Sequence, residues 1–416
     1  MRAAIPTGSL DAQGNLLLTV TFCVALLVRL IVIGNTIGFQ TPAALEPAAD
    51  SRIHIMLVEN LLAGRGYSLG EPTGITPPLY IFALAGLYRV FGDPGPVRLV
   101  QAALASVGCV MLFVVGRKLY DPTVGLVAAG ILSFYPLTAY LAGLHLTENL
   151  FLVLLLAILW QALRVEDAPR TPTAAGLGVL IGLAILTRAI FLTFLPFVGL
   201  WACAVWGARD PRARRVLAVV LATAALVVIP WTLRNYLVLG SLVPVQSNSG
   251  MVFWAGNNPQ ADGGMVWPTS RTWTATRPPD DNLYGWRDLS VGQENALYIQ
   301  TALRWIRGHP LDYLRLLPQK LGRLYGFARA VDAQAPRVPV TLRGVHAAVL
   351  LLAVAGVVQS RRDWPRLLLP LSLIAFVNGT TLLFSGATRY IVPMAPSLAL
   401  FSAIMLMALF HRVRSV

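Results

Sequence analysis

Long apolar runs, separated by short clusters of arginine and lysine, take up most of the chain. An α-helix of about 20 apolar residues is long enough to cross the roughly 30 Å hydrocarbon core of a bilayer. Runs near or above this length occur at about 15–37, 97–117, 122–143, 148–164, 174–187, 189–206, 215–233, 342–358, 366–384 and 390–410. The sequence therefore predicts an all-α polytopic membrane protein with about ten transmembrane helices.

The composition excludes an ordinary soluble domain. Of the 416 residues 56% are hydrophobic and 12% are charged, and soluble domains carry about twice that charged fraction. The net charge of +14 might suggest nucleic acid, but the basic residues form no single face and lie between the apolar runs. That distribution is typical of topology signals at an anionic leaflet, so we expect no nucleic-acid partner.

The short apolar run 78–91 decides the predicted topology. If this run does not span and the N-terminus is cytoplasmic, the basic clusters that follow all lie on the cytoplasmic side, as the positive-inside rule requires. These clusters are at 117–118, 164–170, 209–215, 361–366 and 412–414. If the run spans, all but the first of the basic segments move outside. We therefore expect a re-entrant or interfacial helix at 78–91, on the outer surface.

This topology leaves two large outer segments and predicts three parts of the chain. They are an N-terminal transmembrane catalytic module at 1–233 that includes outer loop 39–96, an outer-face loop region at 234–341, and C-terminal transmembrane helices at 342–416. The loop region contains an amphipathic helical pattern at about 293–328. Pro310 and Pro318 are expected to kink or divide that helix, because proline lacks the backbone N–H that an interior position needs.

Two acids at the outer membrane boundary are candidate site residues. Asp50 closely follows the first apolar run, and Glu148 opens the fourth one within LTENLF. A carboxylate at the membrane edge is costly unless it is paired, so such positions suggest function. The alternatives are a solvated loop acid for Asp50 and, for Glu148, an acid favoured by the helix dipole after a Thr147 cap.

The basic candidates are Arg188, Arg234 and Arg389, each at the outer end of a predicted span. The planar guanidinium can bind phosphate oxygens through two hydrogen bonds. The alternative is that these side chains extend to the interface without binding a ligand. His54 and His145 also lie on the outer side and could approach the two acids, or be ordinary helix and loop histidines. No ligand spacing supports a metal site, so no metal ligand is assigned and a divalent cation is left open.

Several stretches together resemble one known superfamily. They are Asp50 with ENLLAGRGYS, TPPLYIFALAGLYRVFG, LTENLF, GLAILTRAIFLTFLP, IPWTLRNYLVLGSLVPVQSNSGMVFWAGNNPQADGG and ATRYIVPMAPSLALFSA. In this order they are similar to the GT-C superfamily of polyprenyl-phosphate-sugar-dependent glycosyltransferases. The branch is that of bacterial relatives of protein O-mannosyltransferase and aminoarabinose transferase, in glycosyltransferase families 39 and 83. The resemblance runs from about residue 15 to residue 403.

The resemblance implies a GT-C type helix bundle with amphipathic juxtamembrane helices. It implies an inverting hexosyl or pentosyl transferase that moves a sugar from a polyprenyl-phosphate donor to an acceptor hydroxyl. Asp50 matches the family's first-loop catalytic acid and would be the general base, and Glu148 matches the acid that opens the fourth helix. Arg234 and Arg389 would serve the donor phosphate. The chain departs from the family at Asp50-Ser51, where Asp-Glu is common, and at Thr76, where a basic residue or histidine is common.

The expected partners are the lipid donor, an acceptor that is a glycolipid, a polysaccharide or a protein, and the bilayer. An Ala- and Arg-rich composition without outer cysteine pairs favours a bacterial plasma membrane, with the site facing the periplasm or cell exterior. One alternative is a transporter or flippase for a lipid-linked sugar, although the sequence lacks the internal repeats that many transporters have. Another is a non-catalytic membrane scaffold.

Overall fold

The computed structural model describes residues 12–266, 289–327 and 340–414, and almost all of this part is helical. The first half contains α1 (Ala12–Thr36), η1 (Ala43–Leu45), α2 (Ala49–Leu62), α3 (Pro78–Phe91), α4 (Pro94–Leu119), α5 (Pro122–Ser133), α6 (Pro136–Leu141), α7 (Glu148–Asp167) and α8 (Thr171–Thr187). The second half contains η2 (Ala189–Phe194), α9 (Leu195–Trp206), α10 (Pro211–Leu239), α11 (Ser249–Ala255), α13 (Val291–Gly308), α14 (Pro310–Leu324), α15 (Val340–Gln359), α16 (Trp364–Leu383), η3 (Thr388–Met394) and α17 (Ala395–Arg414). Two short strands, β1 (Ser68–Leu69) and β2 (Glu71–Pro72), pair as an antiparallel hairpin. The predicted all-α class is confirmed.

Each of the ten predicted apolar runs is helical. Within the described ranges, seven helices are long and apolar enough to span a membrane, and four shorter apolar helices accompany them. The run at 122–143 is divided into α5 and α6, and the break falls just before Pro136. Proline disfavours the helical conformation of the residue before it, so the division has a local cause. The structure is that of a multi-pass helical bundle.

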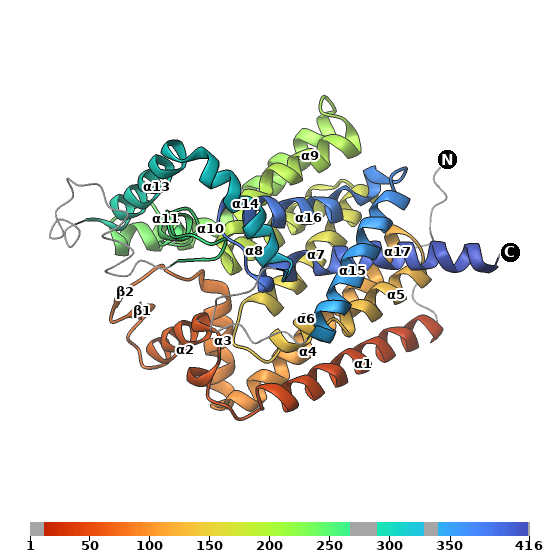
Figure 1. The fold of residues 1–416 in the computed structure, drawn as a ribbon, viewed down its shortest axis with the longest axis horizontal. Helices are drawn as coiled ribbons and strands as arrows, with labels where there is room; N and C mark the ends of the chain where they lie inside the picture. Colours follow the sequence, from red (N-terminus) through yellow and green to blue (C-terminus); the bar gives the residue numbers. More distant parts are fainter. Residues whose placement is uncertain (1–11, 267–288, 328–339, 415–416) are drawn as a thin grey trace.

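Helix α3 is the short apolar segment whose placement decided the predicted topology. It begins after Pro77 and ends at Gly92, which has a left-handed φ of 67°. Fourteen residues at about 1.5 Å each cover only about 21 Å, less than the hydrocarbon core. In Figure 1, α2, α3, the hairpin, α11 and α13 gather at one end of the bundle, opposite the start of α1 and the end of α17. This arrangement agrees with an interfacial α3.

The predicted amphipathic helix at 293–328 is two helices, α13 and α14. The chain breaks at His309, immediately before Pro310, while Pro318 lies inside α14 without ending it. Helix α14 packs against α16 and η3. This part of the predicted loop region thereby packs on the C-terminal helices. The stretches 267–288 and 328–339 of the predicted loop region lie outside the described residues.

Glycines allow several helix pairs to approach closely. A Cβ added to Gly178 of α8 would lie 1.8 Å from Thr223 Oγ1 of α10, and one on Gly356 of α15 would lie 1.9 Å from the carbonyl oxygen of Phe401 in α17. Membrane helices commonly pack through small residues, because lipid offers no hydrophobic driving force between them. Close backbone contact therefore holds these pairs together.

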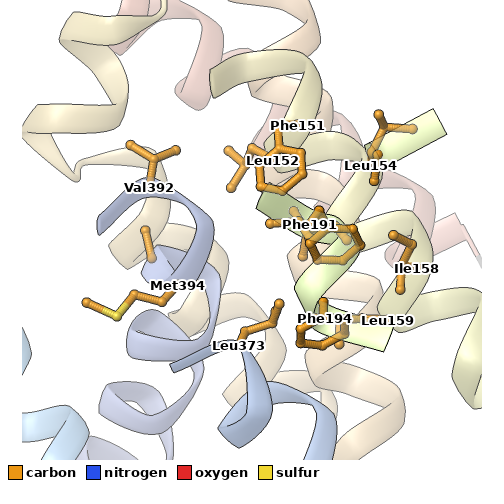
Figure 2. Close-up of a cluster of buried hydrophobic side chains, with 14 of the residues drawn as sticks. Phe151, Leu152, Leu154, Ile158, Leu159, Phe191, Phe194, Leu373, Val392 and Met394 are labelled. Atoms are coloured by element: carbon orange, nitrogen blue, oxygen red, sulfur yellow. The ribbon is translucent and has the colours of Figure 1, made fainter. Parts of the chain in front are cut away.

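An aromatic cluster fixes the elements that carry three of the candidate site residues (Figure 2). The ring of Phe191 in η2 meets Phe151 of α7 edge-on at 5.4 Å and stacks on Phe194 at 4.8 Å. Phe376 of α16 packs edge-on against Phe191 at 5.7 Å. Edge-to-face and stacked rings have preferred geometries, so the cluster restricts how α7, η2 and α16 can move relative to one another. Val392 of η3 lies in the same cluster.

Candidate active site

Two acid–arginine ion pairs form the centre of the site. Asp50 Oδ2 lies 2.6 Å from Arg389 Nη2, and Glu148 Oε1 lies 3.1 Å from Arg188 Nη1. The acids come from α2 and α7, and the arginines from η3 and the end of α8. Four residues singled out in the sequence are thus brought together as two pairs.

Local structure explains how each side chain reaches the site. Asp50 lies in the first turn of α2, and Glu148 is the first residue of α7. Both acids therefore sit where the helix dipole favours negative charge. Thr147 makes no side-chain cap bond, so the cap that belonged to the alternative interpretation of Glu148 is absent. Arg188 has an extended backbone and joins α8 to η2. Three residues later, Phe191 packs in the aromatic cluster and restrains this junction.

The two pairs differ in accessibility. The side chain of Asp50 is 41% exposed and that of Arg389 is 28% exposed, whereas Glu148 is only 3% exposed. A substrate can therefore reach Asp50 and Arg389. The pair of Glu148 and Arg188, whose arginine is 18% exposed, is the more buried one and is called the inner pair. The inner pair also contacts aromatic rings, because the guanidinium of Arg188 lies 5.8 Å from the centroids of Phe151 and Tyr390.

Asp50 is a carboxylate at neutral pH. Partial burial raises its pKa, but the guanidinium of Arg389, with smaller contributions from His54 and Arg188, outweighs that effect and holds the pKa below its ordinary value. Opposite charges nearby favour the ionised form of an acid. The site therefore presents an accessible proton acceptor next to a fixed positive charge.

His54 lies one helical turn after Asp50 on the same face of α2. Its side chain is buried, its Nδ1 lies 2.7 Å from the carbonyl oxygen of His145, and its ring packs edge-on against Tyr80 at 5.4 Å. Burial lowers the pKa of His54, and the nearby Asp50 and Glu148 offset part of this effect. His54 is thus a neutral imidazole beside the two ion pairs.

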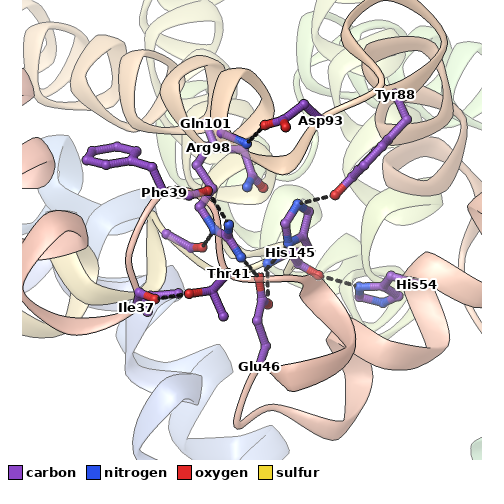
Figure 3. Close-up of polar contacts among 12 residues, drawn as sticks. Ile37, Phe39, Thr41, Glu46, His54, Tyr88, Asp93, Arg98, Gln101 and His145 are labelled. Carbon is purple, nitrogen blue, oxygen red and sulfur yellow. Dashed lines mark hydrogen bonds and ion pairs between the residues drawn. The ribbon is translucent and has the colours of Figure 1, made fainter.

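The sequence left open that His145 approaches Glu148. Instead, its ring contacts Glu46 (Figure 3). His145 Nδ1 lies 2.6 Å from Glu46 Oε1, and its backbone N–H donates to Glu46 Oε2 at 2.9 Å. Arg98 donates to the same carboxylate at 2.7 Å, and Tyr88 OH lies 3.0 Å from His145 Nε2. The network is buried and joins outer loop 39–48, α3, α4 and the turn before α7.

Sequence reasoning missed the roles of Glu46 and Arg98. Burial raises the pKa of Glu46, but its hydrogen bonds and attraction to His145 outweigh this, and the pKa is lowered. Arg98 was discoverable as an arginine inside the apolar run of α4, because a charge at that position needs a partner. Which acid it meets depends on the fold of the outer loop.

Arg234 contacts a different part of the chain, the loop around the β1–β2 hairpin. Its guanidinium donates to the carbonyl oxygens of Thr73 at 2.6 Å and Tyr67 at 3.1 Å, and lies 4.8 Å from the ring of Trp231. These contacts tie the end of α10 to the loop that carries the hairpin. Arg234 also donates to Asn235 Oδ1 at 3.2 Å. Its guanidinium is therefore held by two carbonyl oxygens and one side-chain amide, and its role on a donor phosphate stays a prediction.

The donor set at the centre does not fit a bound metal ion. In the described ranges, no three His, Cys, Asp or Glu side chains are grouped as a metal would require. Asp50 and Glu148 each face an arginine, and a guanidinium beside a carboxylate repels a dication. No step of the chemistry below is assigned to a metal.

The helical bundle and the charged cluster at one of its ends define a multi-pass membrane protein. Residues 76–233 match the family model described as dolichyl-phosphate-mannose-protein mannosyltransferase. That segment runs from the start of α3 into α10 and includes Glu148 and Arg188. Over these residues the match agrees with the resemblance that the sequence predicts. No curated protein matches the chain in sequence.

Solved structures share the fold. The archaeal oligosaccharyltransferase AglB from Archaeoglobus fulgidus, in complex with an inhibitory peptide and a dolichol-phosphate, matches 97% of the chain with a TM-score of 0.58 and 14% identity. The apo form of the A. fulgidus oligosaccharyltransferase matches 96% with a TM-score of 0.55 and 14% identity. The chain spans only about half of those proteins, 51% and 50%. ArnT from Cupriavidus metallidurans bound to undecaprenyl phosphate matches 95% of the chain over 78% of its own length, at 14% identity and with a TM-score of 0.45.

Proposed function

We propose that the chain is an inverting glycosyltransferase that moves a sugar from a polyprenyl-phosphate donor to an acceptor hydroxyl, with Asp50 as general base. The observation that carries this proposal is the accessible ion pair of Asp50 and Arg389. It combines a carboxylate that can accept a proton with a guanidinium that can bind a phosphate. The family match over 76–233 and the shared fold support the same class of enzyme.

In the proposed reaction, Asp50 takes the proton of the acceptor hydroxyl while the oxygen attacks the anomeric carbon. The bond from that carbon to the phosphate oxygen breaks on the opposite face, so the configuration inverts. Arg389 hydrogen-bonds the departing phosphate and balances its growing charge. Without substrate, Arg389 pairs with Asp50. When the guanidinium binds the donor phosphate instead, its positive charge stabilises the Asp50 carboxylate less, so Asp50 becomes a stronger base.

The inner pair has a supporting role in this reaction. Glu148 holds Arg188 at 3.1 Å, and the positive charge of Arg188 also acts on Asp50. Arg188 thereby adds positive potential behind the phosphate position without needing to contact the donor. A role for Arg234 on the donor phosphate would require its guanidinium to leave the carbonyl oxygens of Thr73 and Tyr67.

The proposed location is the outer face of a bacterial plasma membrane. The polar segments around α2, α11 and α13 lie at one end of the bundle, and the basic end of α17 lies at the other (Figure 1). A basic end on the cytoplasmic side follows the positive-inside rule. A lipid phosphate at the outer boundary would then lie close to Asp50, which follows α1 after a short loop.

Two alternatives make different demands on the structure. A transporter or flippase for a lipid-linked sugar typically has its binding site near the bilayer midplane, whereas the ion pairs lie at the ends of α7 and α8. A non-catalytic scaffold does not need an accessible carboxylate. The divalent cation that the sequence left open is not proposed for the two ion pairs; an A. fulgidus oligosaccharyltransferase structure is a complex with Zn and sulfate.

The test is transfer of radiolabelled sugar from a panel of polyprenyl-phosphate sugars, in membranes with matched expression. Asp50→Asn is expected to lower transfer by at least about 100-fold while lipid binding persists. Glu59→Gln is the matched control, because Glu59 is an exposed acid on the same helix. Wild-type transfer by Asp50→Asn refutes the assignment of the base, and no transfer by the wild type from any donor refutes the proposed activity.

A further inference from the structure

The hydrogen bond at Nδ1 determines the tautomer of His54. A carbonyl oxygen can only accept, so the 2.7 Å contact to His145 requires the proton on Nδ1. The neutral ring then carries its lone pair on Nε2. No described residue makes a hydrogen bond to Nε2. His54 therefore has one nitrogen that is fixed as a donor and one that is free to accept a proton.

The carbonyl that fixes this tautomer is itself held in place. Glu46 binds both the backbone N–H and the ring of His145, and Arg98 binds Glu46 (Figure 3). Arg98 also donates to the carbonyl oxygens of Gly143 at 2.9 Å and Phe39 at 2.6 Å. Turning the ring of His54 over would leave a buried carbonyl without its donor, which is costly. The network therefore keeps Nε2 as the acceptor.

His54 is surrounded by charged groups from several elements. Asp50 precedes it by one turn on α2, Glu148 comes from α7, Arg389 from η3, and all three act on its charge. Arg188, at the end of α8, faces the same cluster through Glu148 and Asp50. Tyr80 of α3 closes the apolar side of the ring. Asp50 and Glu148 each pair with a guanidinium. Among the described residues, no guanidinium binds Nε2 of His54, so this nitrogen is available to accept a proton.

We propose that His54 is a second proton acceptor of the transfer reaction, and that Nε2 receives the proton that Asp50 takes from the acceptor hydroxyl. This inference rests on the proposed function. The acceptor O–H bond breaks and a bond from oxygen to the anomeric carbon forms. The bond to phosphate breaks with its electron pair on the phosphate, and the proton ends on His54. The imidazolium later releases it to water, so no other reactant is needed.

The charges of the cluster explain why a second acceptor is useful. A proton left on Asp50 would remove one carboxylate from a cluster that contains two guanidinium groups. Moving that proton to His54 restores the ion pair of Asp50 with Arg389 and places the new positive charge near Asp50 and Glu148. Burial lowers the pKa of His54, so the ring is neutral and ready to accept at neutral pH.

The variants His54→Asn and His54→Gln separate proton transfer from structural support. Asparagine keeps an N–H group near the position of Nδ1, so it can still donate to the carbonyl of His145 and has no Nε2. Glutamine reaches toward the position of Nε2 but loses the short-range donor. Transfer is measured from pH 5 to 9 in vesicles with the donor identified by the panel, and kcat and KM are determined separately.

The wild type is expected to lose kcat/KM toward acid with a midpoint below 6.5, the ordinary pKa of histidine. His54→Asn is expected to lower kcat by about 100-fold, to leave the donor KM unchanged and to remove this acid limb. Adding imidazole to the His54→Gly variant is expected to raise its kcat at least about tenfold over that of the same variant without imidazole.

A His54→Asn enzyme with the rate and pH profile of the wild type overturns the inference. If that variant does not fold, a wild-type profile without an acid limb overturns it equally. Equal loss in His54→Asn and His54→Gln with an unchanged pH profile also overturns it, because a structural role alone explains that result. The variant Asp50→Asn distinguishes the two proposals. If Asp50→Asn loses transfer while His54→Asn keeps wild-type activity, only the proton transfer from Asp50 to His54 is refuted. A wild type that transfers no sugar refutes the proposed function and this proton transfer together.

Discussion

Removing the carboxylate of Glu46 is expected to destabilise the protein strongly. The variant Glu46→Ala deletes the acceptor of Arg98 at 2.7 Å, of the His145 ring at 2.6 Å and of the His145 backbone N–H at 2.9 Å. The side chains of Glu46, Arg98 and His145 are all 0% exposed. Removing one partner of a buried ion pair costs about 3–5 kcal/mol, because the other charge stays buried without compensation. The free energy of unfolding should therefore fall by at least about 3 kcal/mol.

The assay is equilibrium unfolding in mixed micelles with increasing denaturing detergent. The matched control is Glu59→Ala, which removes an exposed acid from α2 and should change the free energy of unfolding by no more than about 0.5 kcal/mol. The double variant Glu46→Ala with Arg98→Met should lose less than the sum of the single variants, because it leaves no unpaired charge. A loss below about 1 kcal/mol in Glu46→Ala would refute this account of the network.

Two further predictions concern other parts of the outer face. Arg389→Lys keeps a positive charge facing Asp50, which Arg389 contacts at 2.6 Å, but loses the planar fork, so donor KM in the transfer assay should rise at least about tenfold. Arg315→Lys, at an exposed position of α14, should match the wild type. Equal donor KM values for Arg389→Lys and Arg315→Lys would contradict a contact between Arg389 and the donor phosphate. Lys320 is buried in α14, where its Nζ donates to Asn257 at 2.7 Å, and burial lowers its pKa to about 7. Between about pH 7 and 10.5 the unfolded chain binds more protons than the folded one, so stability should rise with pH. Lys320→Met should flatten that rise in detergent unfolding curves, and an unchanged slope would count against the buried charge.

The pairing of the site residues depended on tertiary structure. Asp50 and Glu148 were identifiable because a carboxylate at the membrane edge is costly, but nothing local to either acid indicates its arginine. Arg389 reaches Asp50 across most of the chain. The aromatic cluster around Phe191 sets the positions of η2, α7 and α16. Pairing therefore follows from helix packing, which no single stretch of sequence contains.

The two histidines and Arg234 show the same limit. Sequence spacing left His145 equally able to meet Glu148 or to remain a loop residue, and the outer loop brings Glu46 to it instead. Arg234 was a phosphate candidate by position, yet the hairpin loop supplies carbonyl oxygens to its guanidinium. Each outcome depends on how an irregular outer loop folds back, and such loops have no periodicity to read.

The sequence by itself determined the helices, their approximate ends and the multi-pass class. Apolar length and basic clusters act locally, since each helix must satisfy its own backbone hydrogen bonds in lipid. Only the tertiary structure decided which charges meet. An ion pair needs two side chains within about 4 Å, and that distance depends on the rotation and crossing of helices far apart in the chain. The tautomer of His54 was decided in the same way, by a carbonyl from a distant turn.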